Sequence, residues 1–376
     1  MYYTLGGFSV KLLVLAMDYP APDGKVALMY VHQRNKYYAQ AGMDVTVLNF
    51  SAKSCYELDA IHVIDLQTYE QQAARHQYDL LVSHASNLKN HYRFLKKYES
   101  FFQKIVFFFH GHEVLRITQA YPPPFPFASD NAVWRRFLQN RYDTLKLYLW
   151  RRYYEYLAPK SYFVFVSNWL YNEFLQNTKI DRSSIEPHVH IINNSVGNVF
   201  EQNSYHPDVP KDYDFITIRS NMDDSKYGVD IANNLARHNP ELKFLIVGKG
   251  AFFSHYPKAD NVEWMNKTLF HQEMLSLLDR SRCGLLPTRE DTQGVMTCEM
   301  AAYGLPVITS DIPVCHEIFD PLENVILIDN QNTALDLTPL LQELTGKVPF
   351  KKDPRYFYRN TTQKEIALLK QLANEK

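Results

Sequence analysis

Two carboxylates and a glycine lie within one short stretch of the chain, "PTREDTQGVMTCEMAAYGLPVITSD" (287–311). Asp291 and Glu299 are eight positions apart, and Gly294 lies between them. Such a pair could be the acid and base of a glycosidase, whose carboxyl groups lie about 5 to 9.5 Å apart across one bond. A helix predicted over 294–303 places Asp291 in the preceding loop and Glu299 about one and a half turns along it. We therefore expect the two acids to hold different parts of one long ligand.

The same half of the chain offers positive charge for that ligand. Arg219 ends a predicted strand and Lys226 begins the next helix, in "FITIRSNMDDSKYG" (215–228). Two cations at the carboxyl end of a sheet suit a pyrophosphate, because each charge-assisted hydrogen bond contributes about 1.5 to 3 kcal/mol. The helix end near Gly294 adds unpaired N–H groups and a positive dipole. A solvated pair of surface cations is the alternative interpretation of Arg219 and Lys226.

Other patterns in the sequence favour some kinds of site and disfavour others. A carboxylate can accept hydrogen bonds from two vicinal hydroxyls, so Glu299 is a candidate ribose ligand. His110 and His112 in "HGHE" resemble metal ligands, but no third ligand follows at a recognisable spacing. "GKGAFF" follows a predicted strand, but Phe253 occupies the third glycine position of a dinucleotide fingerprint. A metal site and a dehydrogenase are therefore not expected.

Strand-length apolar runs alternate with longer amphipathic stretches along the whole chain. Continuous apolar runs of this kind are typical of parallel strands that are buried on both faces. We predict strands at 11–17, 44–50, 78–84, 104–110, 162–167 and 189–194, then at 215–220, 243–250, 282–288, 306–311 and 324–329. The pattern predicts an α/β fold of two doubly wound parallel sheets, with ligands beyond the carboxyl ends of the strands.

A length of 376 residues favours two domains, because single hydrophobic cores stop growing at about 250 to 300 residues. The polar stretch 201–214 interrupts the alternation of strands and helices. We place a first Rossmann-like domain at 1–200 and a second at 201–352. The segment 353–376 is predicted to be a helix that packs back toward the first domain.

The motif at 287–311 resembles the signature of family 4 retaining glycosyltransferases of the GT-B fold, P-S-x-x-E-G-F-G-x-x-x-x-E-A-x-A-x-G-x-P-V. Further segments are similar to that family in the same order along nearly the whole chain. These are "LAMDYPAPDG", "FFFHGHE", "VSNWL", "IINNSV", "IRSNMDDSKYG" and "LIVGKG". The resemblance implies two Rossmann-like domains that face a cleft, with the acceptor bound by 1–200 and the nucleotide sugar by 201–352.

The resemblance also assigns roles to individual residues. It implies that Arg219 and Lys226 bind the donor diphosphate, that Glu299 binds the ribose, and that His110 lies near the sugar. The implied catalytic or charge-stabilising residues are His110, Asp291, Arg219 and Lys226. The implied donor-binding set is Gly24, Arg219, Lys226, Gly248, Asp291, Thr292, Gln293, Gly294, Val295 and Glu299. The sequence departs from the family pattern where Asp291 replaces Glu, where Thr292 and Gln293 replace Gly-Phe, and where a single Gly24 follows Asp23.

The reaction implied by the resemblance is a hexosyl transfer from a nucleotide-diphosphate sugar to a polysaccharide or lipid-linked saccharide, with retention and without a metal. The acids would then be a clamp, and the leaving diphosphate would take the acceptor's proton. Two alternatives stay open. One is a nucleotide-sugar epimerase on the same fold, and the other is a catalytically silent partner subunit that binds nucleotide sugars.

The charge is unevenly distributed along the chain. Residues 1–198 carry 21 Lys and Arg against 16 acids, whereas 199–376 carry 19 against 25. Basic and aromatic residues alternate in 89–104 and 134–160, as in helices that lie on anionic membranes. The alternative is that their aromatic side chains face the core. No recognised nucleic-acid-binding fold accompanies the charge, so nucleic acid is not an expected partner.

The sequence also suggests a cellular compartment. The four cysteines, Cys55, Cys283, Cys298 and Cys315, form no CxxC pair, which favours reduced, buried thiols. No run reaches the roughly 18 apolar residues of a membrane span, and the first apolar stretch is predicted to be a strand and not a signal peptide. We expect a cytoplasmic protein that is peripheral on the inner face of the cell membrane.

Overall fold

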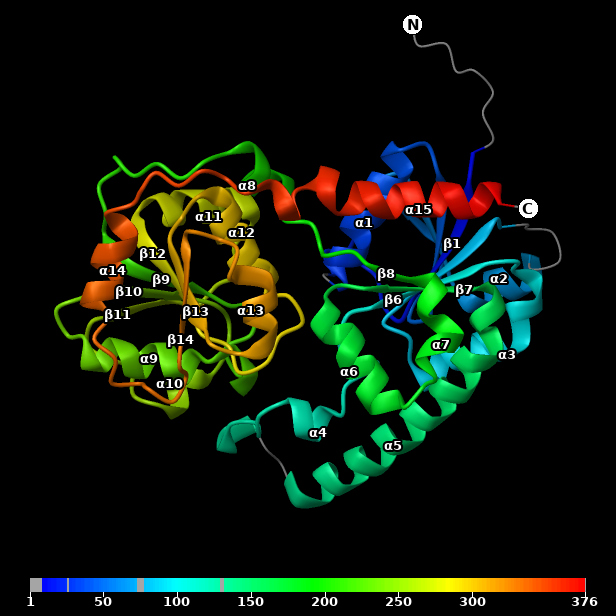
Figure 1. The fold of residues 1–376 in the computed structure, drawn as a ribbon, viewed down its shortest axis with the longest axis horizontal. Helices are drawn as coiled ribbons and strands as arrows, with labels where there is room; N and C mark the ends of the chain where they lie inside the picture. The colour runs from blue at the N-terminus through cyan, green and yellow to red at the C-terminus, as the bar shows by residue number, and fades with distance from the viewer. Residues whose placement is uncertain (1–8, 26, 73–77, 129–131, 376) are drawn as a thin grey trace, which may run out of the picture. The chain divides into compact units, whose positions relative to one another are not determined.

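The computed structural model describes residues 9–25, 27–72, 78–128 and 132–375. The chain forms two compact units, each with its own parallel sheet (Figure 1). Unit 1 consists of Met1–Leu115, Tyr142–Ile192 and Thr362–Lys376, and unit 2 of Arg116–Arg141 and Asn193–Thr361.

The sheet of unit 1 has the strand order β3-β4-β2-β1-β5-β6-β7-β8. All neighbouring strands are parallel except β3 and β4. The strands are β1 (Lys11–Ala16), β2 (Asp44–Asn49), β3 (Tyr56–Leu58), β4 (Ile61–Ile64), β5 (Leu80–His84), β6 (Ile105–Phe109), β7 (Ser161–Phe165) and β8 (Val189–Ile191).

The sheet of unit 2 is wholly parallel, with the order β11-β10-β9-β12-β13-β14. Its strands are β9 (Tyr213–Ile218), β10 (Phe244–Val247), β11 (Val262–Met265), β12 (Ser281–Leu286), β13 (Val307–Ser310) and β14 (Val325–Ile328). Ile216 of β9 pairs with Leu245 of β10 on one side and with Gly284 of β12 on the other. The strand order therefore reverses between β9 and β12, and ligands of doubly wound sheets bind at the carboxyl ends of such strands.

Helices connect the strands in both units (Figure 1). The helices are α1 (Met29–Gln40), α2 (Leu66–Gln72), α3 (Arg93–Tyr98), α4 (Ile117–Ala120), α5 (Ala132–Leu157), α6 (Asn168–Thr178), α7 (Arg182–Ile185), α8 (Asn198–Gln202), α9 (Val229–His238), α10 (Phe252–His255), α11 (His271–Asp279), α12 (Val295–Tyr303), α13 (Pro313–Phe319), α14 (Thr338–Thr345) and α15 (Thr362–Asn374).

The predicted fold class is confirmed, and each predicted strand overlaps an observed one. The prediction missed β3, β4 and β11, which are only three or four residues long. The final helix is α15, which belongs to unit 1, and two 3-10 turns at Pro354–Tyr356 and Tyr358–Asn360 precede it.

Much of the aromatic content lies in the core of unit 1. Phe109 of β6 stacks on Phe165 of β7 with ring centroids 4.5 Å apart, and Trp150 of α5 stacks on Tyr154 at 4.9 Å. Within 89–104, Phe94, Leu95, Tyr98 and Phe102 are also buried. The core interpretation therefore holds for these side chains, whereas α5 also exposes a second set of aromatic residues.

The cysteines differ from expectation at one position. Cys283, Cys298 and Cys315 are buried free thiols, but Cys55 is exposed. The prediction of a buried thiol was wrong at Cys55 because this residue immediately precedes the short, half-exposed strand β3. Within the described parts of the chain, no helix has both the length and the apolar composition to cross a bilayer.

Candidate functional site

Arg219 follows β9 at the point where the strand order of unit 2 reverses. Its guanidinium is buried, and Nη2 donates a 2.7 Å hydrogen bond to the carbonyl oxygen of Pro287, just after β12. Nε is also buried but has no acceptor among the described residues. Burial lowers the pKa of Arg219 to about 10, and the nearby Asp291 opposes that shift. Arg219 is therefore a buried cation with an unused donor at the carboxyl edge of the sheet.

Lys226 brings a second cation to the same place. Its Nζ lies 4.7 Å from the ring centre of Tyr227, and Cζ of Arg219 lies 5.4 Å from the same ring. Nζ is also 5.0 Å from the ring of Tyr121. No described carboxylate forms an ion pair with either cation. Because aromatic faces attract cations, the rings hold both charges without neutralising them.

The turn that carries Lys226 is fixed by local bonds. Oδ1 of Asp224 accepts from the backbone N–H of Lys226 at 3.1 Å, and the carbonyl oxygen of Lys226 accepts from the N–H of Arg289 at 2.7 Å. Gly228 has a φ of +60°, and a Cβ there would lie 2.6 Å from the carbonyl oxygen of Pro287. A side chain at this position would force the turn away from β12.

The predicted donor-binding Gly248 lies against the same edge. Its position just after β10 places the backbone against the end of β9, since a Cβ on Gly248 would come within 2.3 Å of the carbonyl oxygen of Arg219. The N–H of Arg219 in turn donates to the carbonyl oxygen of Val247 at 2.9 Å. Gly248 therefore allows the close approach that positions Arg219.

Asp291 shapes the turn that leads into α12. Its Oδ1 accepts hydrogen bonds from the N–H groups of Thr292 at 2.7 Å, Gln293 at 3.2 Å and Gly294 at 2.9 Å. Gly294 is left-handed, with a φ of +71°, and α12 begins at Val295. These three amides are engaged by Asp291, so an anion at this helix end would meet the N–H groups of Val295 and the next residues.

Glu299 lies on α12 and is 5% exposed. Its Oε1 accepts from the N–H of Gly197 at 3.0 Å and lies 3.9 Å from Nε2 of His271. Burial raises the pKa of Glu299 to about 7, and the hydrogen bond from Gly197 partly opposes the shift. The carboxylate therefore retains acceptor capacity in a desolvated place, as a clamp for two hydroxyls requires.

Gln293 connects the turn before α12 to a distant part of unit 2. Its Oε1 accepts from the N–H of Asn194 at 2.6 Å, and its Nε2 donates to the carbonyl oxygen of Asn194 at 3.0 Å. Gly197, three residues further, packs closely, since a Cβ there would lie 2.9 Å from Cε1 of His271. Gln293 and Glu299 together hold 194–197 against the start of α12.

The other two predicted site residues, His110 and Gly24, belong to unit 1. Nε2 of His110 lies 3.1 Å from Nδ1 of His84, and its ring centre lies 4.6 Å from that of Tyr30. Burial and the nearby Arg34 hold the pKa of His110 well below its usual value. His110 is thus a neutral imidazole suited to hydrogen bonding. Gly24 lies in an exposed turn with a φ of +89°.

The geometry of unit 2 agrees with a comparison to known families. Residues 217–344 match the family model described as glycosyl transferases group 1. The matched segment is similar to that family over about a third of the chain. It contains Arg219, Lys226, Gly248, the 291–295 turn and Glu299. No curated protein sequence matches the chain.

Solved structures show the fold of the whole chain. Sucrose-phosphate synthase from Thermosynechococcus elongatus has a TM-score of 0.70 at 14% identity, over 96% of this chain and 99% of that one. A glycosyltransferase from Rickettsia africae has 0.69 at 14%, over 98% and 100%. HepE from Anabaena, solved with UDP and glucose, has 0.57 at 11%, over 97% and 98%. At this level of identity the likenesses show the GT-B fold alone.

Several residues around the candidate site were not predicted from the sequence. Tyr227 lies between the two predicted cations, and its only sequence signal is its position next to Lys226. Gly197 and His271 come from distant segments, and their approach to Glu299 leaves no local pattern. Among the described residues, no cluster of three or more side chains is arranged to hold a metal ion.

Proposed function

We propose that the protein is a retaining glycosyltransferase that moves a hexosyl group from a nucleotide-diphosphate sugar to a saccharide acceptor. The observation that carries the proposal is the buried, incompletely bonded guanidinium of Arg219 beside Lys226, at the strand reversal of unit 2. A buried cation that forms no ion pair is costly unless an anion joins it. A diphosphate supplies that anion, and Glu299 lies on the adjacent helix to bind the ribose.

The proposed reaction uses the protein for position and charge and not as a nucleophile. The acceptor oxygen forms a bond to the anomeric carbon on the face from which the diphosphate leaves. The bond between that carbon and the diphosphate oxygen breaks, and the leaving oxygen takes the acceptor's proton. Arg219, Lys226 and the first turn of α12 stabilise the negative charge that grows on the diphosphate. In this proposal they stabilise the leaving group as a bound metal ion would.

The proposed acceptor is a polysaccharide or a lipid-linked saccharide, and the proposed location is the inner face of the cell membrane. Support comes from α5, which exposes large apolar side chains together with several arginines. The exposed apolar set is Trp134, Phe137, Leu138, Tyr142, Leu145, Tyr148 and Tyr156. Aromatic and basic residues on one helix suit the headgroup region of an anionic bilayer. Because most aromatic residues of 89–104 are buried, α5 is the stronger candidate for docking.

Two alternative functions use the same donor site. An epimerase would isomerise the donor sugar, and a silent partner subunit would bind the donor without reaction. The buried Arg219 and the raised pKa of Glu299 are compatible with donor binding in all three cases. They are separated by products, since only a transferase releases free nucleotide together with a new glycoside.

A thermal-shift panel of nucleotide sugars tests donor binding before the acceptor is known. A ligand at 100 times its dissociation constant stabilises the folded protein by about 2.7 kcal/mol. We expect one nucleotide sugar to raise the unfolding temperature of the wild type and of Lys351→Ala, which removes an exposed lysine that pairs with no acid in the described part of the chain. Lys226→Ala should lose that shift. An equal shift in Lys226→Ala would refute the proposed diphosphate site.

A further inference from the structure

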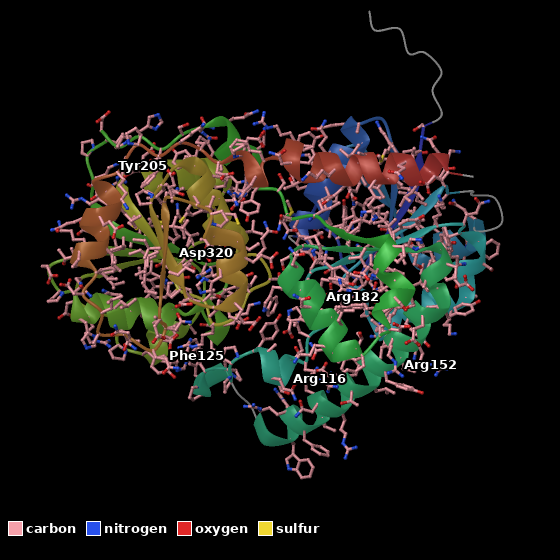
Figure 2. All side chains as sticks on the ribbon, viewed as in Figure 1. Arg116, Phe125, Arg152, Arg182, Tyr205 and Asp320 are labelled. Atoms are coloured by element: carbon pink, nitrogen blue, oxygen red, sulfur yellow. The ribbon has the colours of Figure 1, made fainter. Side chains whose placement is uncertain are left out.

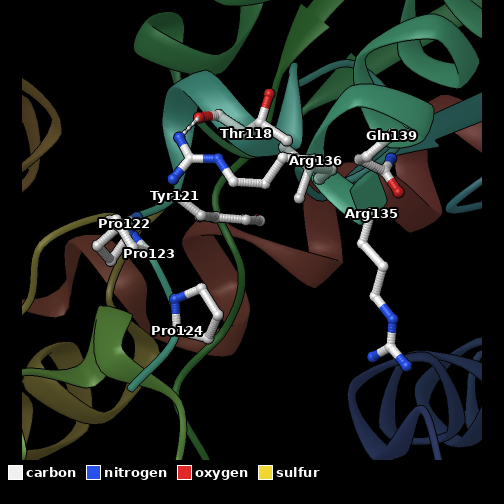
Figure 3. A pocket seen from close by; sticks show the side chains of 9 residues that line it. Thr118, Tyr121, Pro122, Pro123, Pro124, Arg135, Arg136 and Gln139 are labelled. Carbon is white, nitrogen blue, oxygen red and sulfur yellow. Dashed lines mark hydrogen bonds between the residues drawn. The ribbon is translucent and has the colours of Figure 1, made fainter. Parts of the chain in front are cut away.

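A pocket lies beside the candidate donor site, within unit 2. It has a volume of about 220 Å³ and is formed by α4, the prolines that follow it and the first turns of α5 (Figure 3). Tyr121 and the prolines provide apolar faces, and α5 contributes the donors of Arg135, Arg136 and Gln139, with the Arg135 side chain extending away from that of Arg136 (Figure 3). The lining residues are Ile117, Thr118, Tyr121, Pro122, Pro123, Pro124, Arg135, Arg136 and Gln139.

The proline segment is anchored to unit 2. The ring of Phe125 is buried 5.1 Å from that of Phe252, and Figure 2 labels Phe125 at this edge of unit 2. Phe127 stacks on His255 with ring centres 4.2 Å apart. Oγ of Ser225 donates to the carbonyl oxygen of Pro123 at 2.7 Å. The floor of the pocket is therefore held in place by the domain that carries the candidate donor site.

Tyr121 connects the pocket to the diphosphate site. It lines the pocket, and its ring lies 5.0 Å from Nζ of Lys226. Ser225, which fixes Pro123, is the residue before Lys226. A ligand in the pocket would therefore lie next to the leaving diphosphate, where an acceptor must lie for group transfer.

The charged side of the pocket favours an anionic ligand. Neither Arg135 nor Arg136 forms an ion pair with a described acid. Nη2 of Arg136 makes one long bond, 3.4 Å, to the carbonyl oxygen of Thr118, and Figure 3 shows its side chain passing near Tyr121. Most guanidinium donors thus remain for a ligand, and guanidinium groups recognise phosphate by paired hydrogen bonds.

We propose that this pocket binds a phosphate-bearing sugar of the acceptor, an inference that rests on the proposed transferase function. The sugar ring lies on Tyr121 and the prolines, and Arg135 and Arg136 bind its phosphate. The volume of about 220 Å³ is below the roughly 300 to 1,000 Å³ of drug-sized sites, so it fits one sugar ring. The phosphate can belong to a soluble sugar phosphate or to a lipid carrier, since the chemistry is the same.

Calorimetric titration with glucose 1-phosphate and with glucose tests the pocket without any nucleotide. We expect Arg135→Ala/Arg136→Ala to lower the affinity for glucose 1-phosphate at least tenfold, with glucose binding much more weakly than its phosphate to the wild type. Arg141→Ala/Arg152→Ala is the matched control, because it removes two arginines of the same helix that do not line the pocket. The lipid arm is a flotation assay that compares phosphatidylcholine vesicles containing a polyprenyl phosphate with vesicles in which phosphatidylglycerol supplies the same negative charge.

The outcomes separate the two sources and the two proposals. Binding of glucose 1-phosphate that depends on Arg135 and Arg136 supports a soluble source, and dependence seen only with polyprenyl phosphate vesicles supports a lipid source. Equal loss of glucose 1-phosphate affinity in the control, no loss in the double variant, or no binding to the wild type in either arm overturns the pocket proposal. Loss in Lys226→Ala together with full binding in the double variant places the ligand at the diphosphate site and also overturns it. Absence of nucleotide-sugar binding contradicts the proposed function alone.

Discussion

We predict that the ionisation of Glu299 makes donor binding depend on pH. Its pKa is raised to about 7 by burial. An ionised carboxylate can accept from both ribose hydroxyls, whereas the protonated form gives up acceptor capacity. We expect the affinity for a nucleotide sugar to rise with pH through about 7, and Glu299→Gln to bind more weakly and without that rise. Calorimetric titration across pH measures it, and a nucleotide sugar avoids the terminal phosphate ionisation of a free nucleotide.

The same carboxyl lowers folding stability as pH rises, whereas it raises the affinity for the donor. Its pKa is about 4.3 when unfolded and about 7 when folded, so the folded state binds the proton more tightly. Its contribution to stability is complete below about pH 4.3 and is lost as pH rises toward about 7. Glu299→Gln should therefore show less loss of stability than the wild type across this interval, as read from denaturant unfolding. Parallel stability curves would contradict the buried environment of Glu299.

Gln293 offers a second test at the residue scale. Its side chain forms hydrogen bonds with both the N–H and the carbonyl oxygen of Asn194. Truncation of Gln293 removes both of these bonds. Leaving buried polar groups unpaired costs about 1 to 3 kcal/mol. We expect Gln293→Ala to lower the free energy of unfolding by that amount and to weaken donor binding, because the Gly197 N–H is carried by the same segment. Gln331→Ala, at an exposed loop position, should leave both unchanged.

Sequence patterns located the charged residues of the candidate site but not the contacts that position them. Arg219 and Lys226 are seven positions apart next to a predictable strand, and the structure brings both to Tyr227. Gln293 and Asn194 are 99 positions apart, and Glu299 and Gly197 are 102 apart. Pairings of that range depend on the packing of complete elements, so no local pattern indicates them.

At the scale of elements, buried parallel strands are predictable because their apolar runs are continuous, but α5 is not. One side of α5 contributes Leu147, Trp150, Tyr153, Tyr154 and Leu157 to the core. Another side exposes Trp134, Phe137 and Leu138, with Arg135 and Arg141 beside them. Figure 2 labels Arg152 further along the helix. Since apolar residues occur on both sides, composition alone left the membrane and core interpretations open. The core interpretation holds for the buried face, and membrane docking of the exposed face stays a prediction.

The exposed face of α5 predicts binding to anionic bilayers. Trp134 is 74% exposed, and the other tryptophans are buried or half-buried, so a blue shift of emission would report its entry into the headgroup region. We expect this shift with phosphatidylglycerol vesicles but not with phosphatidylcholine alone, and a weaker shift at high salt. Leu138→Ala/Phe137→Ala should weaken co-sedimentation.

Phe101→Ala provides the control for membrane docking, because Phe101 is 60% exposed but lies in the 89–104 segment. Its binding to vesicles should match that of the wild type. Recovery of all the wild-type protein in the supernatant with anionic vesicles would count against docking. If Phe101→Ala lost as much vesicle binding as Leu138→Ala/Phe137→Ala, the membrane contact would include the 89–104 segment.

At the scale of the whole molecule, the chain leaves unit 1 after Ile192 and returns at Thr362 to complete it with α15. The predicted boundary near residue 200 was placed at a change in composition. The segment 116–141 packs with unit 2, and its composition does not indicate this. The contact of Phe125 with Phe252 explains this assignment, because one buried aromatic residue fixes the proline segment to the second sheet's helices. Such an excursion of the chain is set by packing and leaves no compositional mark.

The return of the chain depends on a buried ion pair in unit 1. Nε of Arg34 on α1 lies 3.1 Å from Oε1 of Glu365 on α15, and the hydroxyl of Tyr38 donates to Oε2 at 2.6 Å. Removing one partner of a buried pair leaves an uncompensated charge and costs about 3 to 5 kcal/mol. We expect Glu365→Ala to lower the free energy of unfolding of unit 1 by about this amount.

Glu375→Ala is the matched control, since Glu375 pairs with Lys104 in an exposed position on the same part of the chain. Nucleotide-sugar binding, which we assign to unit 2, should persist in folded Glu365→Ala, and hydrogen exchange should show faster opening of α1 and α15 alone. Equal stability of the two variants would contradict the assigned role of α15.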